Sequence, residues 1–131
     1  MRLLLDTHVL LWWLADDHKL SKDARTMIAN GDHQVLVSTA SIWEIAIKSA
    51  LRRIEIELDD LEDAIVKSGF EPLPIGVQHA VRVGRLPNIH RDPFDRMLVA
   101  QAGVEELRLV THDRVFERYG LGAEGLPPIF V

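Results

Sequence analysis

Short apolar runs alternate along the chain with longer segments of helical periodicity. The runs at 2–5, 34–37 and 107–110 are continuous and brief, which predicts buried strands. The segment 71–75 also looks strand-like, and its two prolines favour an edge position in a sheet. A last short strand is expected over 129–131. The chain therefore predicts four or five strands separated by helices.

Helices are expected in the intervals between these strands. The predicted ranges are 7–15, 21–30, 41–51, a segment from Asp59 or Asp60 to Gly69, 77–86 and 93–102. Gly31 and Gly103 are expected to end two of them. Strands that alternate with helices imply right-handed crossovers and a parallel sheet covered on both faces. We therefore expect one α/β domain over residues 1–131.

Composition excludes several classes of protein. With 47% hydrophobic and 27% charged residues, the 131-residue chain has the make-up of a globular domain. The absence of cysteine excludes disulfides, thiolate metal sites and a cysteine nucleophile, and it indicates a reducing cytoplasm. No segment reaches the roughly 20 apolar residues of a membrane helix. The net charge of −5 argues against coating nucleic acid by bulk charge and leaves room for an acidic, metal-recruiting pocket.

Four acids lie at predicted strand ends and helix starts. Asp6 directly follows the first strand, and Asp113 follows the strand at 107–110. Glu44 and Asp95 fall in the first turns of two predicted helices. Because ligands of parallel α/β sheets bind beyond the carboxyl ends of the strands, we expect these four carboxylates to converge on one pocket.

Crowded carboxylates repel each other, and their pKa values rise unless a cation neutralises them. Mg²⁺ and Mn²⁺ prefer carboxylate oxygen and water, with substrate phosphates often completing the shell. Two such ions about 3.5–4 Å apart can activate a water and stabilise the leaving oxygen in phosphodiester cleavage. The sequence predicts this chemistry and leaves open whether one ion or two are bound.

Helix capping is a second interpretation of each acid. Ser41 to Glu44 fits a capping box, and Asp6 and Asp113 could each cap the turn or helix that follows. Asp6 is the hardest to explain in this way alone, since it splits an apolar run where an unpartnered charge is costly to bury.

Asp92 and Asp95 compete for one role. Asp92 precedes Pro93, the combination expected at an N-cap and a first helical position. A capping carboxylate is occupied by backbone donors, whereas Asp95 lies one turn further on. We therefore assign the helix start to Asp92 and metal binding to Asp95.

The segments LLLDTHVLLWWL, SIWEIAIK, HRDPFDRMLVAQA and LVTHD occur in an order that resembles the PIN-domain ribonucleases, specifically the VapC-type toxins of prokaryotic toxin–antitoxin pairs. The four segments span essentially the whole chain. The resemblance implies a PIN-like fold, a three-layer α/β/α sandwich with a mostly parallel central sheet. It also implies Mg²⁺- or Mn²⁺-dependent endonucleolytic cleavage of RNA.

By the same resemblance, the metal-binding and catalytic acids are Asp6, Glu44, Asp95 and Asp113, and Thr111 matches a Ser or Thr that accompanies the last acid. Asp113 occupies the least uniform of the four positions. The family implies attack by a metal-bound water that leaves a 5′-phosphate and a 3′-hydroxyl. It further implies a small cognate antitoxin, which inserts a C-terminal segment near the pocket, and a homodimer.

Arginines and tryptophans near these acids have two interpretations each. Arg91 and Arg96 flank Asp95 and could guide RNA phosphates, and Arg96 could equally pair with a neighbouring acid. Trp12, Trp13 and Trp43 could stack on bases. Because two of the three lie in apolar runs, we expect packing in the core or in a dimer interface. The three tryptophans are therefore not assigned to the site.

Three other functions compare less well with the sequence. An aspartyl phosphotransferase usually has a second Asp two residues after the first, and here that position is His8. A catalytically idle PIN-like binding module is opposed by the presence of all four acids. The segment 120–125 matches a dinucleotide-binding pattern as a string, but no βαβ unit encloses it, so we interpret it as a turn.

Overall fold

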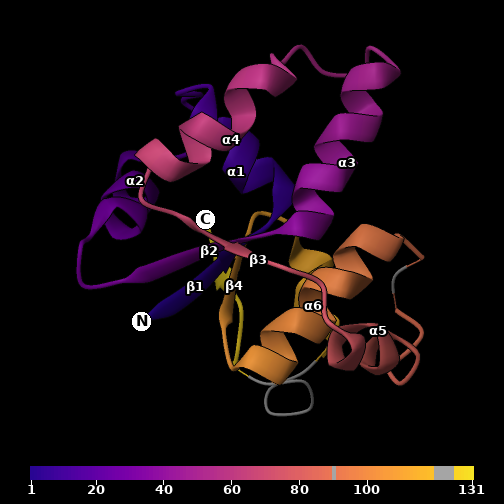
Figure 1. Ribbon diagram of the computed structural model, residues 1–131. Helices are drawn as coiled ribbons and strands as arrows, with labels where there is room; N and C mark the ends of the chain where they lie inside the picture. Colours follow the sequence, from indigo (N-terminus) through magenta and orange to yellow (C-terminus); the bar gives the residue numbers. More distant parts are fainter. Residues whose placement is uncertain (90, 120–125) are drawn as a thin grey trace.

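The computed structural model describes residues 1–89, 91–119 and 126–131. A five-stranded sheet runs through the centre, with helices above and below it (Figure 1). The strands are β1 (Arg2–Leu5), β2 (Gln34–Ser38), β3 (Glu71–Leu73), β4 (Arg108–Thr111) and β5 (Ile129–Phe130). They lie in the order β3-β2-β1-β4-β5, and each described pair is parallel. The predicted α/β sandwich is confirmed.

Within the described residues, six α-helices and one 3₁₀ helix connect the strands. They are α1 (Thr7–Leu14), α2 (Lys22–Ala29), α3 (Thr39–Ala50), α4 (Leu58–Lys67), α5 (Val77–Val83), α6 (Pro93–Glu105) and η1 (Arg114–Tyr119). The described part of the chain contains no helix with the length and apolar character needed to cross a membrane. The glycine-rich segment 120–125, interpreted as a turn, lies outside the described residues.

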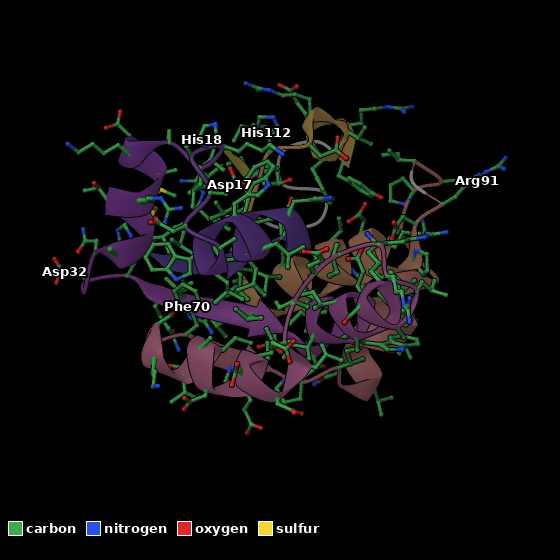
Figure 2. The ribbon with its side chains drawn as sticks, turned by 90° about the horizontal axis from the view of Figure 1, so that it is seen from above. Asp17, His18, Asp32, Phe70, Arg91 and His112 are labelled. Atoms are coloured by element: carbon green, nitrogen blue, oxygen red, sulfur yellow. The ribbon has the colours of Figure 1, made fainter. Side chains whose placement is uncertain are left out.

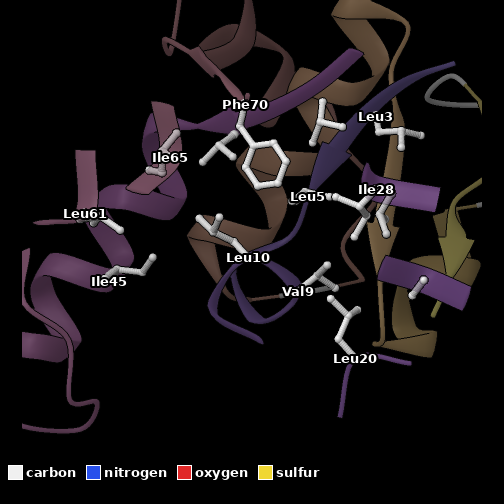
Figure 3. Close-up of a cluster of buried hydrophobic side chains, with 14 residues drawn as sticks. Leu3, Leu5, Val9, Leu10, Leu20, Ile28, Ile45, Leu61, Ile65 and Phe70 are labelled. Carbon is white, nitrogen blue, oxygen red and sulfur yellow. The ribbon is translucent and has the colours of Figure 1, made fainter. Parts of the chain in front are cut away.

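Alternation along the strands builds one hydrophobic core on each face of the sheet. Leu3 and Leu5 of β1 point into a cluster completed by α1, α2, α3 and α4 (Figure 3). Leu4, between them, points to the opposite face and packs in a cluster formed mainly by α6 and η1. All three leucines are fully buried. A continuous apolar run is therefore required, because both faces of β1 are covered.

β3 is an edge strand of the described sheet, as predicted. β3 pairs only with β2 among the described strands, and Pro72 has no N–H to donate to a second neighbour. β3 ends at Leu73, two residues earlier than predicted.

The start of α3 differs from the prediction. The helix begins at Thr39, and its N-cap is Ser38, whose hydroxyl accepts from the N–H of Ala40 at 3.0 Å. The predicted capping box of Ser41 and Glu44 is therefore wrong. Ser41 is fully buried inside the helix, where its hydroxyl accepts from Thr7 Oγ1 at 3.0 Å. The physical reason is that β2 runs directly into α3, so the last residue of the strand supplies the cap.

The predicted end of α6 at Gly103 is also wrong. The helix continues to Glu105, and Glu106 takes the left-handed conformation with φ of 55°. Glycine inside a helix costs about 1 kcal/mol relative to alanine. Burial of Ala102 and Leu107 on either side outweighs that cost, because both pack in the core under α6. The remaining differences are small: α5 ends at Val83 rather than near residue 86.

Candidate active site

The carboxyl edge of the sheet gathers residues from four parts of the chain. β1 and β4 are neighbours and run in the same direction, so Asp6 and Thr111 end side by side. α3 leaves the same edge directly from β2. The C-terminal end of α6 leads into the start of β4, so the N-terminal turn of α6, with Asp95, lies back toward the carboxyl edge. α3 contacts both α1 and α6, which closes the group.

Asp6 is buried, with 4% of its surface exposed, and both of its oxygens are occupied. Oδ1 accepts from the N–H of Val9 at 2.8 Å and so caps α1. Oδ2 accepts a short hydrogen bond from the hydroxyl of Thr111. Burial raises the pKa of Asp6, and the hydrogen bonds from Thr111 and Val9 partly counteract it. One oxygen of Asp6 therefore caps α1 while the other lies at the carboxyl edge of the sheet, so helix capping does not exclude a place in the predicted pocket.

Thr111 connects two of the acids. Its fully buried hydroxyl donates to Asp6 and accepts from the backbone N–H of Asp113 at 3.0 Å. Asp113 itself is exposed, and its Oδ1 accepts from the N–H of Val115 at 2.9 Å at the start of η1. The strand end at β4 is thus held by a chain of hydrogen bonds that begins at Asp6.

Glu44 lies on the other side of the site, in the second turn of α3. It is 4% exposed, and its Oε2 accepts from Lys48 Nζ at 2.6 Å. Its Oε1 is buried and receives no hydrogen bond from any residue that the structure describes. A buried acceptor without a donor is costly, so Oε1 is well suited to accept a ligand.

Asp95 is a second acid whose pKa is raised. Burial, followed by repulsion from Asp92, Glu44, Asp6 and Asp113, raises its pKa from 3.8 to about 7. This electrostatic coupling joins Asp95 to the other three candidate acids. Asp92, by contrast, caps α6 as predicted, since its Oδ1 accepts from the N–H groups of Phe94 at 2.8 Å and Asp95 at 3.1 Å.

These residues fit a hard cation in their chemistry. Among the described side chains, no group of three or more His, Asp or Glu is close enough to hold a metal ion by itself. Mg²⁺ does not require such a group, because it keeps several waters and is held by one or two carboxylates together with substrate phosphates. The oxygen-only donor set, the unpaired Glu44 Oε1 and the raised pKa of Asp95 all favour a bound cation.

The two candidate arginines have different environments. The guanidinium of Arg96 donates to the carbonyls of Val83 at 3.0 Å and Pro87 at 2.9 Å, and so ties the end of α5 to the start of α6. This structural role was not predicted. Arg91 is exposed and extends outward from the α5–α6 connection (Figure 2). The guanidinium of Arg96 is thus engaged by backbone carbonyls, whereas a contact of Arg91 with RNA phosphates stays a prediction.

Sequence reasoning considered Lys48 as a cation that could guide RNA phosphates and did not identify it as the partner of Glu44. The signal was present in the spacing, since a Glu four residues before a Lys on a helix forms an ion pair.

The tryptophans differ from one another: Trp12 and Trp13 pack against the core, whereas Trp43 is 59% exposed and meets Phe94 edge-on at 5.2 Å. Trp43 and Phe94 directly adjoin Glu44 and Asp95 in the sequence.

A parallel α/β sheet with carboxylates gathered toward its carboxyl edge defines a class of α/β proteins with an acidic site at that edge. Within that class, the chain belongs to the PIN domain family, whose model matches residues 3–121. The resemblance noted in the sequence is thereby confirmed.

Relatives and solved structures agree with this family. The chain is 31% identical over 122 residues to Ribonuclease VapC22 of Mycobacterium tuberculosis. The alignment covers 85% of this chain and 86% of that protein. VapBC2 from Rickettsia felis, solved bound to a promoter DNA fragment, shares the fold with a TM-score of 0.70 at 14% identity, covering 97% of each chain. DNA-bound VapBC from Salmonella typhimurium gives 0.69 at 18% identity, covering 97% of this chain and 96% of that one.

Proposed function

We propose that the protein is a VapC-type endoribonuclease, the toxin of a type II toxin–antitoxin pair, which hydrolyses RNA phosphodiester bonds with Mg²⁺ or Mn²⁺. The observation that carries the proposal is the geometry of the carboxyl edge, where buried Asp6 ends β1 and the buried Oε1 of Glu44, which has no donor among the described residues, lies on α3, the helix that contacts both α1 and α6. The similarity to Ribonuclease VapC22 over most of both chains supports the same activity.

Each acid has a distinct part in this proposal. Asp6 and Asp95 would anchor the ion, and Glu44 and Asp113 would complete its surroundings. A bound divalent ion supplies an activated water and stabilises the leaving oxygen of the phosphodiester. Thr111 fixes the orientation of Asp6 by its hydroxyl hydrogen bond, as partners of metal ligands commonly do. Burial and the neighbouring carboxylates raise the pKa of Asp95, and a bound cation would lower it again and favour the ionised form that can hold the ion.

The proposed partners are RNA, a small cognate antitoxin and a second copy of this chain. The solved VapBC complexes with the same fold support the antitoxin. Trp43 and Ile47 of α3 and its C-cap residue Leu51 expose apolar surface at one-turn intervals, which supports a homodimer. We place the activity in the cytoplasm, in keeping with a chain that contains no cysteine.

The test is cleavage of structured RNA by the purified protein with Mg²⁺ or Mn²⁺, and with excess chelator. Asp6→Asn and Asp95→Asn should abolish the cut products while circular dichroism shows a retained fold. Asp92→Asn is the matched control, because asparagine caps a helix as well as aspartate does and the variant should stay active. Products should carry a 5′-phosphate. Cleavage that persists in chelator would contradict the proposal.

A catalytically idle binding module is the competing outcome of the same experiment. It would bind the RNA in a gel-shift assay and leave it intact with every divalent ion tested. In that case the three Asn variants would not differ from the wild type in any RNA-cleavage measurement.

A further inference from the structure

Lys48 is a cation built into the acidic edge. Its ammonium lies 2.6 Å from Oε2 of Glu44, and its side chain is 30% exposed. Glu44 itself is almost completely buried, and its second oxygen, Oε1, has no donor among the described residues. One carboxylate therefore presents two unequal oxygens, one neutralised by a lysine and one available.

A second Lys–acid pair in the chain shows that this arrangement is specific to the site. Lys67 and Asp63 have the same four-residue spacing and a similar distance of 2.8 Å on α4. Their side chains are 75% and 66% exposed, as is ordinary for a surface ion pair that contributes little. The Lys48–Glu44 pair is instead withdrawn from solvent, where an uncompensated charge is costly. The ammonium of Lys48 therefore compensates a charge that solvent does not reach.

Carboxylates that bridge two cations offer one oxygen to each. In two-metal sites the ions stand about 3.5–4 Å apart and share the charge of the attacking and leaving oxygens. In this site, one of the two positions on Glu44 already holds positive charge. A divalent ion at Oε2 would have to displace the ammonium.

We propose that the ammonium of Lys48 takes the place of a second divalent cation, so that each chain binds one Mg²⁺ or Mn²⁺ ion. Lys48 is a positioning residue that holds Oε2 and leaves the buried Oε1 available to a cation. A compact ammonium with three donors can also balance charge on an RNA phosphate beside the ion. The inference rests on the proposed metal-dependent function and adds the number of ions to it.

The experiment counts bound Mn²⁺ on the full chain without RNA, by electron paramagnetic resonance of free Mn²⁺ at neutral pH. The wild type and Lys48→Arg, which keeps the positive charge, should each bind one ion per chain. Lys48→Met, which removes it, should bind two. Lys67→Met is the matched control, because it removes the exposed pair of the same spacing, and it should bind one.

RNA cleavage gives a second readout. The dependence of rate on Mn²⁺ concentration should change from a Hill coefficient of about 1 in the wild type to about 2 in Lys48→Met, as expected when a second ion is needed. If Lys48→Met does not fold by circular dichroism, Lys48→Gln keeps a hydrogen-bond donor without the charge and should give the same two-ion result.

The outcomes separate this inference from the proposed function. Two ions on the wild type, or one ion on both neutral Lys48 variants, would overturn the role of Lys48 and leave metal-dependent cleavage standing. Absence of any bound Mn²⁺ on the wild type would overturn the inference about Lys48, and the proposed function would fall with it only if RNA cleavage also persisted in excess chelator.

Discussion

The two halves of the acidic edge are built on opposite principles. On the strand side, Asp6 is fully hydrogen-bonded, and Thr111 links it to the backbone of Asp113. On the helix side, Glu44 keeps an unpaired buried oxygen and Asp95 carries a pKa raised to about 7. On the strand side, hydrogen bonds thus offset part of the cost of burying Asp6 and fix its orientation, whereas on the helix side the described residues leave one buried oxygen of Glu44 without a donor, an unfavourable state that a cation would relieve.

The difference follows from where each acid lies in its element. Asp6 stands between a strand and a helix, where the backbone N–H of Val9 has no partner within the helix and can donate to it. Glu44 lies inside α3, where the nearby N–H groups are already used by the helix. A buried carboxylate at such a position can be satisfied only by side chains or by a ligand, and Lys48 supplies half of what it needs.

The largest expected effect is on the strand side. Asp6→Ala removes a helix cap and leaves the hydroxyl of Thr111 without its buried acceptor. These losses together should lower the free energy of unfolding by about 3 kcal/mol, measured by urea denaturation in the absence of metal. Asp6→Asn keeps the acceptor for Val9 and should cost clearly less. An unchanged urea midpoint in Asp6→Ala would show that the strand side is not an anchor.

The helix side should respond in the opposite direction. The pKa of Asp95 is higher in the folded protein than in the unfolded chain. The folded state therefore binds the proton more tightly, and this contribution to stability, complete below about pH 4, is lost as the pH rises through about 7. A shift of three units corresponds to about 4 kcal/mol. Because Asp95 is only part-buried, we expect Asp95→Asn to stabilise the metal-free protein by about 2 kcal/mol at pH 8.

Urea denaturation across pH 4 to 8 measures both the sign and the size of the change in unfolding free energy caused by Asp95→Asn. The stabilisation by Asp95→Asn should shrink as the pH is lowered and vanish near pH 4. Asp92→Asn, which keeps the cap on α6 and removes one of the repelling charges, should give a smaller gain. Destabilisation by Asp95→Asn at pH 8 would contradict the crowded-acid description of the helix side.

A bound divalent ion should relieve the repulsion on the helix side and so stabilise the folded protein. At ten times the dissociation constant, an ion that binds only the folded protein adds about 1.4 kcal/mol, which corresponds to a rise in Tm of about 4 °C for a domain of this size. Differential scanning fluorimetry at pH 8 with Mn²⁺ measures it. The rise should be absent in Asp95→Asn and retained in the control Asp63→Asn, which changes an exposed acid on α4. Equal rises in both variants would place the ion elsewhere.

Much of the fold could be predicted because local signals agree with it. The apolar run of β1 ends at an acid, and the Asp92–Pro93 pair starts α6 where the structure starts it. The start of α3 could not be predicted in the same way, since Ser38 and Ser41 are both good caps. What decides between them is tertiary: Ser41 is needed for a buried hydrogen bond with Thr7, 34 residues away.

The sequence predicts which edge of the sheet the acids belong to, and it does not predict their contacts. The hydroxyl that donates to Asp6 comes from Thr111, 105 residues later. The spacing of apolar and polar residues along the chain does not predict a contact between residues so far apart. The unequal oxygens of Glu44 depend on the rotamer of one side chain, which the pattern of residues does not fix. The metal-binding role of the acids remains a prediction.

The substitution with the smallest expected effect on stability tests the strand side most directly, because it separates the orientation of Asp6 from the stability of the fold. Thr111→Val removes the hydroxyl that joins Asp6 to Asp113 while keeping the shape of the side chain. It should cost about 1 kcal/mol of unfolding free energy and lower RNA cleavage by roughly 10- to 100-fold, the usual effect of losing a group that orients a metal ligand. Thr111→Ser retains the hydroxyl and should recover most of the cleavage rate. A Ser variant as slow as the Val variant would mean that the methyl group, and not the hydrogen bond to Asp6, is what the strand side requires.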